Sequence, residues 1–181
     1  GNLAPEDARK VISQGLRGAE EMRPGTIGRE VVAYGPDPSK PYQMRYRLVD
    51  LDSLIPSHTD AFAPNPAYPK ELQPRMRERG ASRLWVQETA GKLSPEALIT
   101  DVAALDRGSP IVGSDLVVES GNGRVMAMRF ARQDHPERWA AYQEKLRESL
   151  PQLGFSERDI ATMRNPVVVR ERLTPVDRVR F

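Results

Sequence analysis

The chain has 181 residues, of which 39% are hydrophobic and 29% charged, and its mean hydropathy is −0.57. This length suits one domain with its own hydrophobic core, and the composition excludes a disordered chain. No apolar run reaches the roughly 20 residues of a membrane helix, so we expect a cytoplasmic protein that has no membrane partner.

Residue counts also limit the chemistry. The chain has no cysteine and only two histidines, which excludes disulfides, thiolate zinc sites and cysteine nucleophiles. Any metal would need carboxylate ligands, as Mg²⁺ or Mn²⁺ does. The net charge is +2, and most of the basic residues are arginines. Arginine suits phosphate binding, although a genome whose base composition favours arginine codons explains this bias equally well.

The N-terminal part of the chain contains three predicted elements. Residues 5–21 show the apolar periodicity of an amphipathic helix. Residues 30–34 and 43–49 read as two strands, and the proline-rich segment 35–41 between them predicts a hairpin turn.

Residues 56–74 contain too many prolines for a regular element. We expect an ordered, functional loop, with Phe62 and Tyr68 as its buried side chains.

The middle of the chain predicts two helices followed by a strand, turn and helix. Residues 84–93 have helical spacing, and a second helix is predicted to begin at Pro95 and to include Val102 and Leu105. Two short strands are then expected at residues 110–113 and 116–119. After the glycines that follow them, residues 124–131 resume as a helix.

The C-terminal part reads as two helices and a strand. Asp134 and Glu137 mark the start of one helix, Ser156 caps a shorter one, and residues 165–170 form a strand. Three large aromatic side chains are expected in the core rather than in a stacking surface: Trp85, Trp139 and Tyr142. Residues 173–181 carry no stop signal, so we expect a domain excised from a longer protein, with flanking domains as partners.

The most informative segment is the turn Glu119-Ser120-Gly121-Asn122-Gly123-Arg124. Its two glycines allow a sharp turn from strand to helix, and a helix N-terminus presents free N–H groups and a partial positive charge. A phosphate fits there, and it would explain why the cation Arg124 lies at that end of the helix dipole. An ordinary structural turn with two glycines is the alternative interpretation.

The segment Gly121-x-x-Arg124-x-x-Ala127 resembles the G-E-R-R-x-x-A box of the ParB/sulfiredoxin superfamily, and Leu72-Gln73-Pro74-Arg75 resembles its Q-P-R box. Within that superfamily the chain is most similar to the DdrB-like ParB domain, which occurs in long multi-domain proteins of phages, plasmids and other conjugative elements. The further motifs that carry this resemblance are Ser57-His58, Asn65-Pro66-Ala67-Tyr68-Pro69, Pro110-Ile111-Val112-Gly113 and Pro166-Val167-Val168-Val169-Arg170.

The resemblance implies an α/β (α+β) fold of the ParB/sulfiredoxin type, with a small mixed sheet, surrounding helices and a leading N-terminal helix. Residues 1–42 would form a helix and hairpin extension, and residues 43–181 the ParB-like domain. It further implies that CTP or ATP is bound by Arg75, Ser120, Gly121, Asn122, Gly123 and Arg124. The chain departs from the box of the partitioning proteins at two positions, since Asn122 stands in place of its glutamate and Gly123 in place of its first arginine. Sulfinic-acid reduction is excluded because the chain lacks the cysteine of sulfiredoxin.

Two further side chains are candidates for catalysis. The superfamily's free-serine kinases place an acidic residue near this turn, so Glu119 could be a general base or a ligand of Mg²⁺. An exposed polar residue at a strand end is the alternative. His58 could exchange protons near neutral pH, or it could fix the loop by a hydrogen bond.

The first hypothesis for function is a nucleotide-binding ParB-like module that handles DNA of a phage or mobile element in the bacterial host cytoplasm, with slow triphosphate hydrolysis. A metal-dependent DNA nuclease and a non-catalytic interaction module are the alternatives, so the sequence leaves enzymatic activity open. Arg77, Arg79 and Arg83 could contact DNA weakly and without sequence specificity, or form an ordinary solvated surface.

Overall fold

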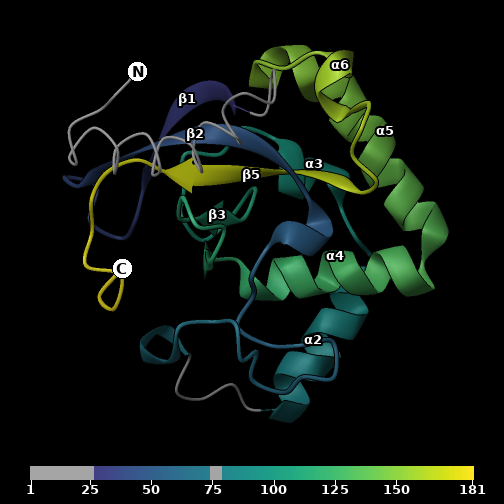
Figure 1. Cartoon of the computed structure of the whole chain (residues 1–181), viewed down its shortest axis with the longest axis horizontal. Helices are drawn as coiled ribbons and strands as arrows, with labels where there is room; N and C mark the ends of the chain where they lie inside the picture. The colour runs from purple at the N-terminus through teal and green to yellow at the C-terminus, as the bar shows by residue number, and fades with distance from the viewer. Residues whose placement is uncertain (1–26, 74–78) are drawn as a thin grey trace, which may run out of the picture.

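The computed structural model describes residues 27–73 and 79–181. Its N-terminal strands are β1 (Ile27–Tyr34) and β2 (Pro41–Asp50), which pair antiparallel with Val31 opposite Met44 (Figure 1). The predicted hairpin is confirmed. The predicted helix at residues 5–21 lies outside the described residues.

Three later strands complete a five-stranded mixed sheet of order β1-β2-β5-β3-β4. Strand β5 (Pro166–Arg172) pairs antiparallel with β2 and parallel with β3 (Ile111–Val112). Strand β4 (Val118–Ser120) pairs antiparallel with β3 at the edge of the sheet. The α+β class and the small mixed sheet expected from the sequence are therefore confirmed.

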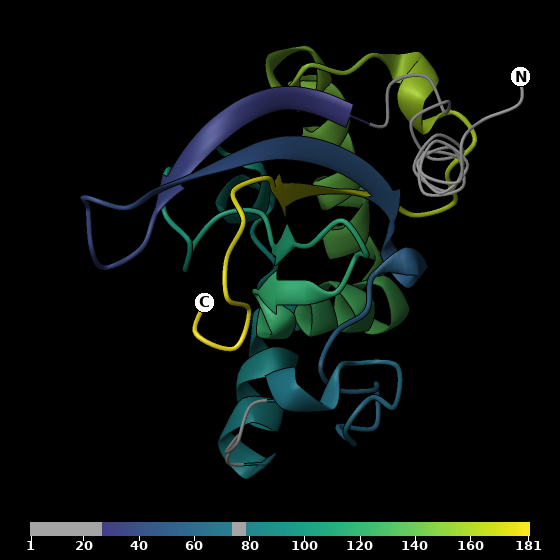
Figure 2. The same cartoon turned by 60° about the vertical axis from the view of Figure 1, so that its left-hand side comes forward.

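The helices are α2 (Arg79–Gly91), α3 (Pro95–Ile99), α4 (Asn122–Asp134), α5 (Pro136–Leu153) and α6 (Glu157–Ile160). In both Figure 1 and Figure 2, α4 lies between the sheet and α2. Helix α5 packs on both α3 and α4, and α2 packs on α4. The turn between β4 and α4 therefore lies close to α2, which is distant in the sequence.

The helix predicted at residues 84–93 is α2, which begins five residues earlier, and further predicted helix boundaries are also wrong. Helix α3 ends at Ile99, because Thr100 takes an extended backbone conformation, so Val102 and Leu105 are not helical. Asp134 is the last residue of α4, and His135 occupies the N-cap position of α5 without a side-chain cap. Local propensity does not locate this tight junction, because the packing of one helix on the other decides where the chain bends.

The main core lies between the sheet and the helices, and it includes Tyr46, Leu48, Val168, Met126 and Leu146. Trp139 and Tyr142 stack within it with their ring centroids 5.2 Å apart, as expected. Trp85 does not belong to this core, since 48% of the residue is exposed. The periodicity of α2 is satisfied by Val86, Ala90 and the following Leu93, which turns Trp85 toward another face.

The long loop after β2 is irregular but well packed, as predicted. Two short 3₁₀ turns, Leu51–Ser53 and Lys70–Leu72, interrupt it. Tyr68 is buried, and Phe62 stacks on Phe130 of α4 at 5.5 Å between centroids. Within the described ranges, no helix is long and apolar enough to cross a membrane.

Candidate functional site

The strand-to-helix turn at the start of α4 has the local geometry that its glycines predict. Gly121 is the N-cap of the helix and has a φ of 95°, in the left-handed region that favours glycine. The helix begins at Asn122, two residues earlier than predicted, so Arg124 lies within its first turn.

The Arg124 side chain folds back over this turn. A Cβ on Gly121 would lie only 2.8 Å from the Arg124 guanidinium. The guanidinium donates hydrogen bonds to the carbonyl oxygen of Gly108 and, at 3.3 Å, to Oγ of Ser120. Burial lowers the pKa of Arg124, and the nearby charge of Asp106 only partly opposes that effect. Among the described residues no carboxylate forms an ion pair with Arg124, so the compensating groups here are neutral oxygens.

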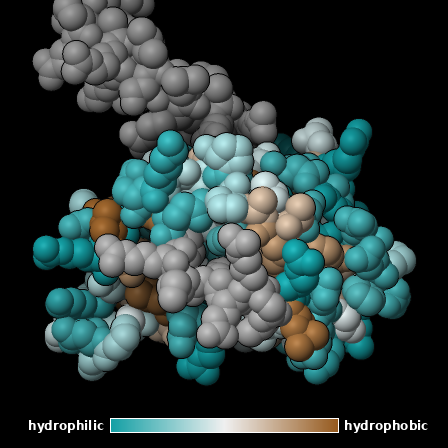
Figure 3. Space-filling view, turned by 90° about the horizontal axis from the view of Figure 1, so that it is seen from below, coloured by the Kyte–Doolittle hydropathy of each residue, from teal (hydrophilic) through white to brown (hydrophobic). Residues whose placement is uncertain are grey.

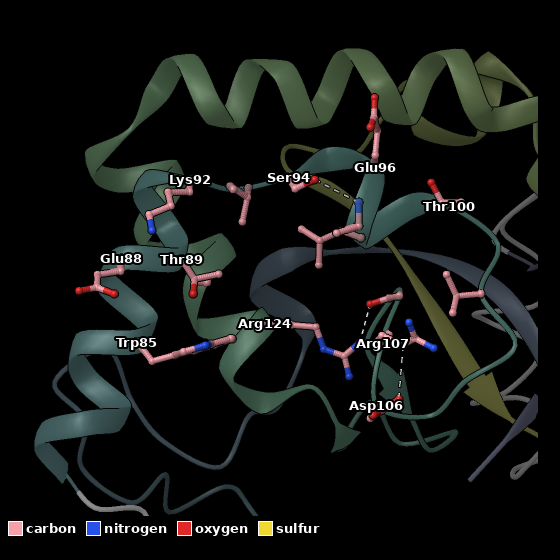
Figure 4. A pocket seen from close by; sticks show the side chains of 16 residues that line it. Trp85, Glu88, Thr89, Lys92, Ser94, Glu96, Thr100, Asp106, Arg107 and Arg124 are labelled. Atoms are coloured by element: carbon pink, nitrogen blue, oxygen red, sulfur yellow. Dashed lines mark hydrogen bonds and ion pairs between the residues drawn. The ribbon is translucent and has the colours of Figure 1, made fainter. Parts of the chain in front are cut away.

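A pocket of about 680 Å³ opens beside this guanidinium, between α2, α3 and the loop before β3 (Figure 4). Its apolar wall includes Leu93, Ala97, Leu98, Val102 and Ala127, and its polar lining includes Lys92, Asp106, Arg107 and Arg124. Glu88 and Glu96 also line it, so three carboxylates accompany three basic side chains, and Arg124 is the cation whose burial favours a negative charge of a ligand beside it.

Gly123 has a role that the sequence did not reveal. A Cβ at this position would lie 2.7 Å from Cζ3 of Trp85, so the indole ring packs directly on the glycine. Gly123 is buried, and Trp85 lines the pocket. The absence of a side chain at residue 123 therefore allows Trp85 to approach the first turn of α4.

Asn122 points away from the pocket and holds the long loop. Its Oδ1 accepts a hydrogen bond from the buried backbone N–H of Ser57 at 2.8 Å, and the Gln73 side chain donates to the Ser57 carbonyl at 2.9 Å. His58 Nδ1 lies 2.8 Å from Ser57 Oγ. Neither Asn122 nor His58 lines the pocket.

Glu119 is the centre of an ion network at the other side of the turn. Its carboxylate accepts two hydrogen bonds from Arg172, at 2.7 and 2.9 Å, and one from Arg178 at 2.8 Å. Arg178 also binds both oxygens of Asp115. The Glu119 side chain is only 3% exposed, so it is not the exposed polar residue of the second interpretation. The described residues contain no group of three or more side chains that could hold a metal ion.

Arg170 of β5 organises the loop that forms one wall of the pocket. Although it is only 1% exposed, it donates five hydrogen bonds to four backbone carbonyls, those of Val102, Ala104, Arg107 and Ser109. Arg170 pairs with Tyr46 across the sheet, so its side chain reaches this loop from the helix-covered face. The shape of the pocket therefore depends on a strand that is remote in the sequence.

The arginines proposed for phosphate or DNA contact give little further information. Arg75 and Arg77 lie outside the described residues, as does the side chain of Arg79. The guanidinium of Arg83 lies 4.8 Å from the ring centroid of Phe62 in a cation–π contact.

The structure thus brings part of the predicted site together. Of these predicted site residues only Arg124 lines the pocket; Ser120 and Gly121 lie against its side chain, whereas Glu119, His58 and Asn122 serve other contacts. The sequence did not indicate that Trp85, Lys92 and Gly108 line a pocket, or that Arg170 holds its loop. The spacing of Trp85, Glu88, Thr89 and Lys92 could have indicated a second face of α2, distinct from its core face.

Residues 37–173 match the ddrB-like ParB superfamily domain, and the chain belongs to this superfamily. Comparison with curated proteins and with solved structures finds no match.

Proposed function

We propose that this ParB-like domain binds a nucleotide in the pocket beside α4, with the phosphate group at Arg124. We further propose that this binding serves DNA handling in a phage or other mobile element. ATP and CTP are the triphosphates that the sequence resemblance favours.

The observation that carries the proposal is the state of the Arg124 guanidinium. It is partly buried, it faces the pocket, and its hydrogen-bond partners among the described residues are a carbonyl and a hydroxyl oxygen rather than a carboxylate. A partly buried cation whose hydrogen-bond partners are neutral gains free energy when an anion binds beside it. A phosphate supplies that charge and can accept two hydrogen bonds from one guanidinium.

The size of the pocket agrees with this ligand class. Its volume of about 680 Å³ lies within the range of small-molecule sites, roughly 300–1,000 Å³. Lys92 lies on the same lining and can balance a second negative charge. The apolar wall from α3 suits a base or sugar better than it suits an isolated inorganic ion.

The proposal contains no catalytic step. Glu119, the carboxylate that a hydrolytic or nuclease mechanism would use, is held by two arginines and does not line the pocket. Both of its oxygens already accept hydrogen bonds from these arginines, so neither is placed to act on a ligand in the pocket.

Thermal unfolding with ATP, CTP, GTP or UTP, each with and without Mg²⁺, tests the proposal. A ligand at about 100 times its Kd should add roughly 2.7 kcal/mol to the free energy of unfolding. We expect stabilisation of the unmodified protein and its loss in Arg124→Ala, while Arg138→Ala, at an exposed position of α5, keeps it. If no triphosphate shifts the unfolding temperature at millimolar concentration, the proposed function is wrong.

A further inference from the structure

Trp85 is an unusual side chain for an exposed helix face. The residue is 48% exposed although indole is among the costliest groups to leave in water, and it lines the pocket that contains Arg124. Trp139, the only other tryptophan of the chain, is buried in the core. Since α2 buries Val86 and Ala90 on its core side, folding of this helix does not require an aromatic residue at position 85.

We propose that Trp85 is a stacking platform for the aromatic base of the ligand, an inference that rests on the proposed nucleotide site. The phosphate would lie at Arg124 and the base on the indole. The two side chains come from different helices, α2 and α4, and both face into the same pocket (Figure 4).

The contact between Trp85 and Gly123 supports this role. The six-membered part of the indole packs against the backbone at Gly123, where a Cβ would lie 2.7 Å from Cζ3 and 3.3 Å from Cε3. This contact restricts the ring while about half of the residue stays exposed. A platform that is already held in place loses little side-chain entropy when a base stacks on it.

The lining around Trp85 also fits a flat, mostly apolar group. Leu93 and Ala97 lie on the same pocket wall, and Glu88 and Thr89 offer oxygen atoms that can accept hydrogen bonds near the indole. Figure 3 views the molecule from below, the side on which α2 lies in Figure 1, and hydrophobic residues stand there among hydrophilic ones. Stacking alone discriminates weakly among bases, because every base has a π-face. We therefore expect broad acceptance of bases.

The experiment separates the base from the phosphates by comparing ATP with inorganic tripolyphosphate. Isothermal titration calorimetry measures both ligands on the unmodified protein, Trp85→Leu, Trp85→Phe and the matched control Leu84→Ala, which alters the neighbouring exposed residue. We expect Trp85→Leu to weaken ATP binding about tenfold or more and to leave tripolyphosphate binding unchanged. Trp85→Phe should keep most of the ATP affinity, and Leu84→Ala should change neither ligand.

Fluorescence gives a second readout. In a Trp139→Phe background the emission comes from Trp85 alone, so ATP should quench it, whereas tripolyphosphate should bind without strong quenching. If Trp85→Leu binds ATP as tightly as the unmodified protein, the stacking inference is wrong and the phosphate site stands. Equal loss of both ligands would show that Trp85 only supports the pocket wall. If neither ligand binds the unmodified protein, the proposed function fails, and the inference with it.

Discussion

Arg124 and Arg170 hold neighbouring carbonyl groups of one loop. Arg124 donates to the carbonyl of Gly108, and Arg170 donates to those of Arg107 and Ser109 on either side. Burial, together with the positive charge of Arg124, lowers the pKa of Arg170 to about 10. In the part of the chain that the structure describes, neither guanidinium has an ion-paired carboxylate. The two guanidinium groups are therefore hydrogen-bonded mainly by backbone carbonyls, and the nearby charge of Asp106 acts on both.

Arg124→Ala should remove phosphate binding without unfolding the domain. Charge-assisted hydrogen bonds contribute about 1.5–3 kcal/mol each, so triphosphate affinity should fall at least tenfold. The lost bonds to Gly108 and Ser120 are offset by relief of repulsion with Arg170 and with the helix dipole. Calorimetry and urea unfolding check both parts, and a large loss of stability in the empty protein would identify Arg124 as a purely structural residue.

Arg129 is not a neutral control for that experiment. It donates to the Leu54 carbonyl at 3.2 Å and lies 3.7 Å from a carboxylate oxygen of Asp60, so its removal would loosen the long loop. Arg138 on α5 is exposed and is the better matched substitution.

Arg170→Met should destabilise the domain by about 3 kcal/mol or more, because each buried carbonyl left without a donor costs about 1–3 kcal/mol. Urea unfolding measures the change, and Arg147→Met at an exposed position of α5 controls for the substitution itself. The loop of residues 101–109 should also exchange its amide hydrogens faster. A variant as stable as the unmodified protein would contradict the role of Arg170 as the support of this loop.

Asn122→Ala should free the long loop after β2. Asn122 is the acceptor for the buried Ser57 N–H, so its loss should cost about 1–3 kcal/mol and accelerate hydrogen exchange at Ser57. Nucleotide affinity should change little, because the Asn122 side chain does not line the pocket. If the variant loses nucleotide affinity while the Ser57 amide exchanges as slowly as in the unmodified protein, Asn122 belongs to the binding site.

Acid should weaken the ion pair between Arg178, near the C-terminus, and Asp115, in the turn after β3. Burial alone would raise the pKa of Asp115, but the hydrogen bonds from Arg178 and from the Val117 N–H outweigh it and hold this pKa below its usual value. A lowered folded-state pKa means that the stabilisation is present above about pH 4 and is lost as pH falls through the folded-state pKa. Unfolding measured from pH 6 to pH 2 should show this loss.

Arg178→Gln removes the partner of Asp115, so the free energy of unfolding should fall less between pH 6 and pH 2 in this variant. Arg180→Gln, at a residue whose side chain is 88% exposed, is the control and should keep the full fall. Equal acid sensitivity of both variants would show that other carboxyl groups dominate.

The sequence by itself determined the elements whose signals are local. The hairpin turn, the sharp glycine turn before α4 and the C-terminal strand, predicted at residues 165–170 and found at 166–172, follow from turn chemistry and β-branched runs. The superfamily, too, was accessible from motif order alone, and residues 37–173 confirm it. These features depend on neighbours within a few residues, so a linear pattern contains them.

Only the tertiary structure decided which of the motif residues meet. Glu119 and Arg124 are five positions apart, yet one is enclosed by arginines from the C-terminal segment and the other faces a pocket. Trp85 reaches Gly123 because α2 packs on α4, and Arg170 reaches the pocket loop because β5 lies beside β3. Such contacts join residues that are tens of positions apart. Their energy depends on how the sheet and helices pack, which no local periodicity encodes.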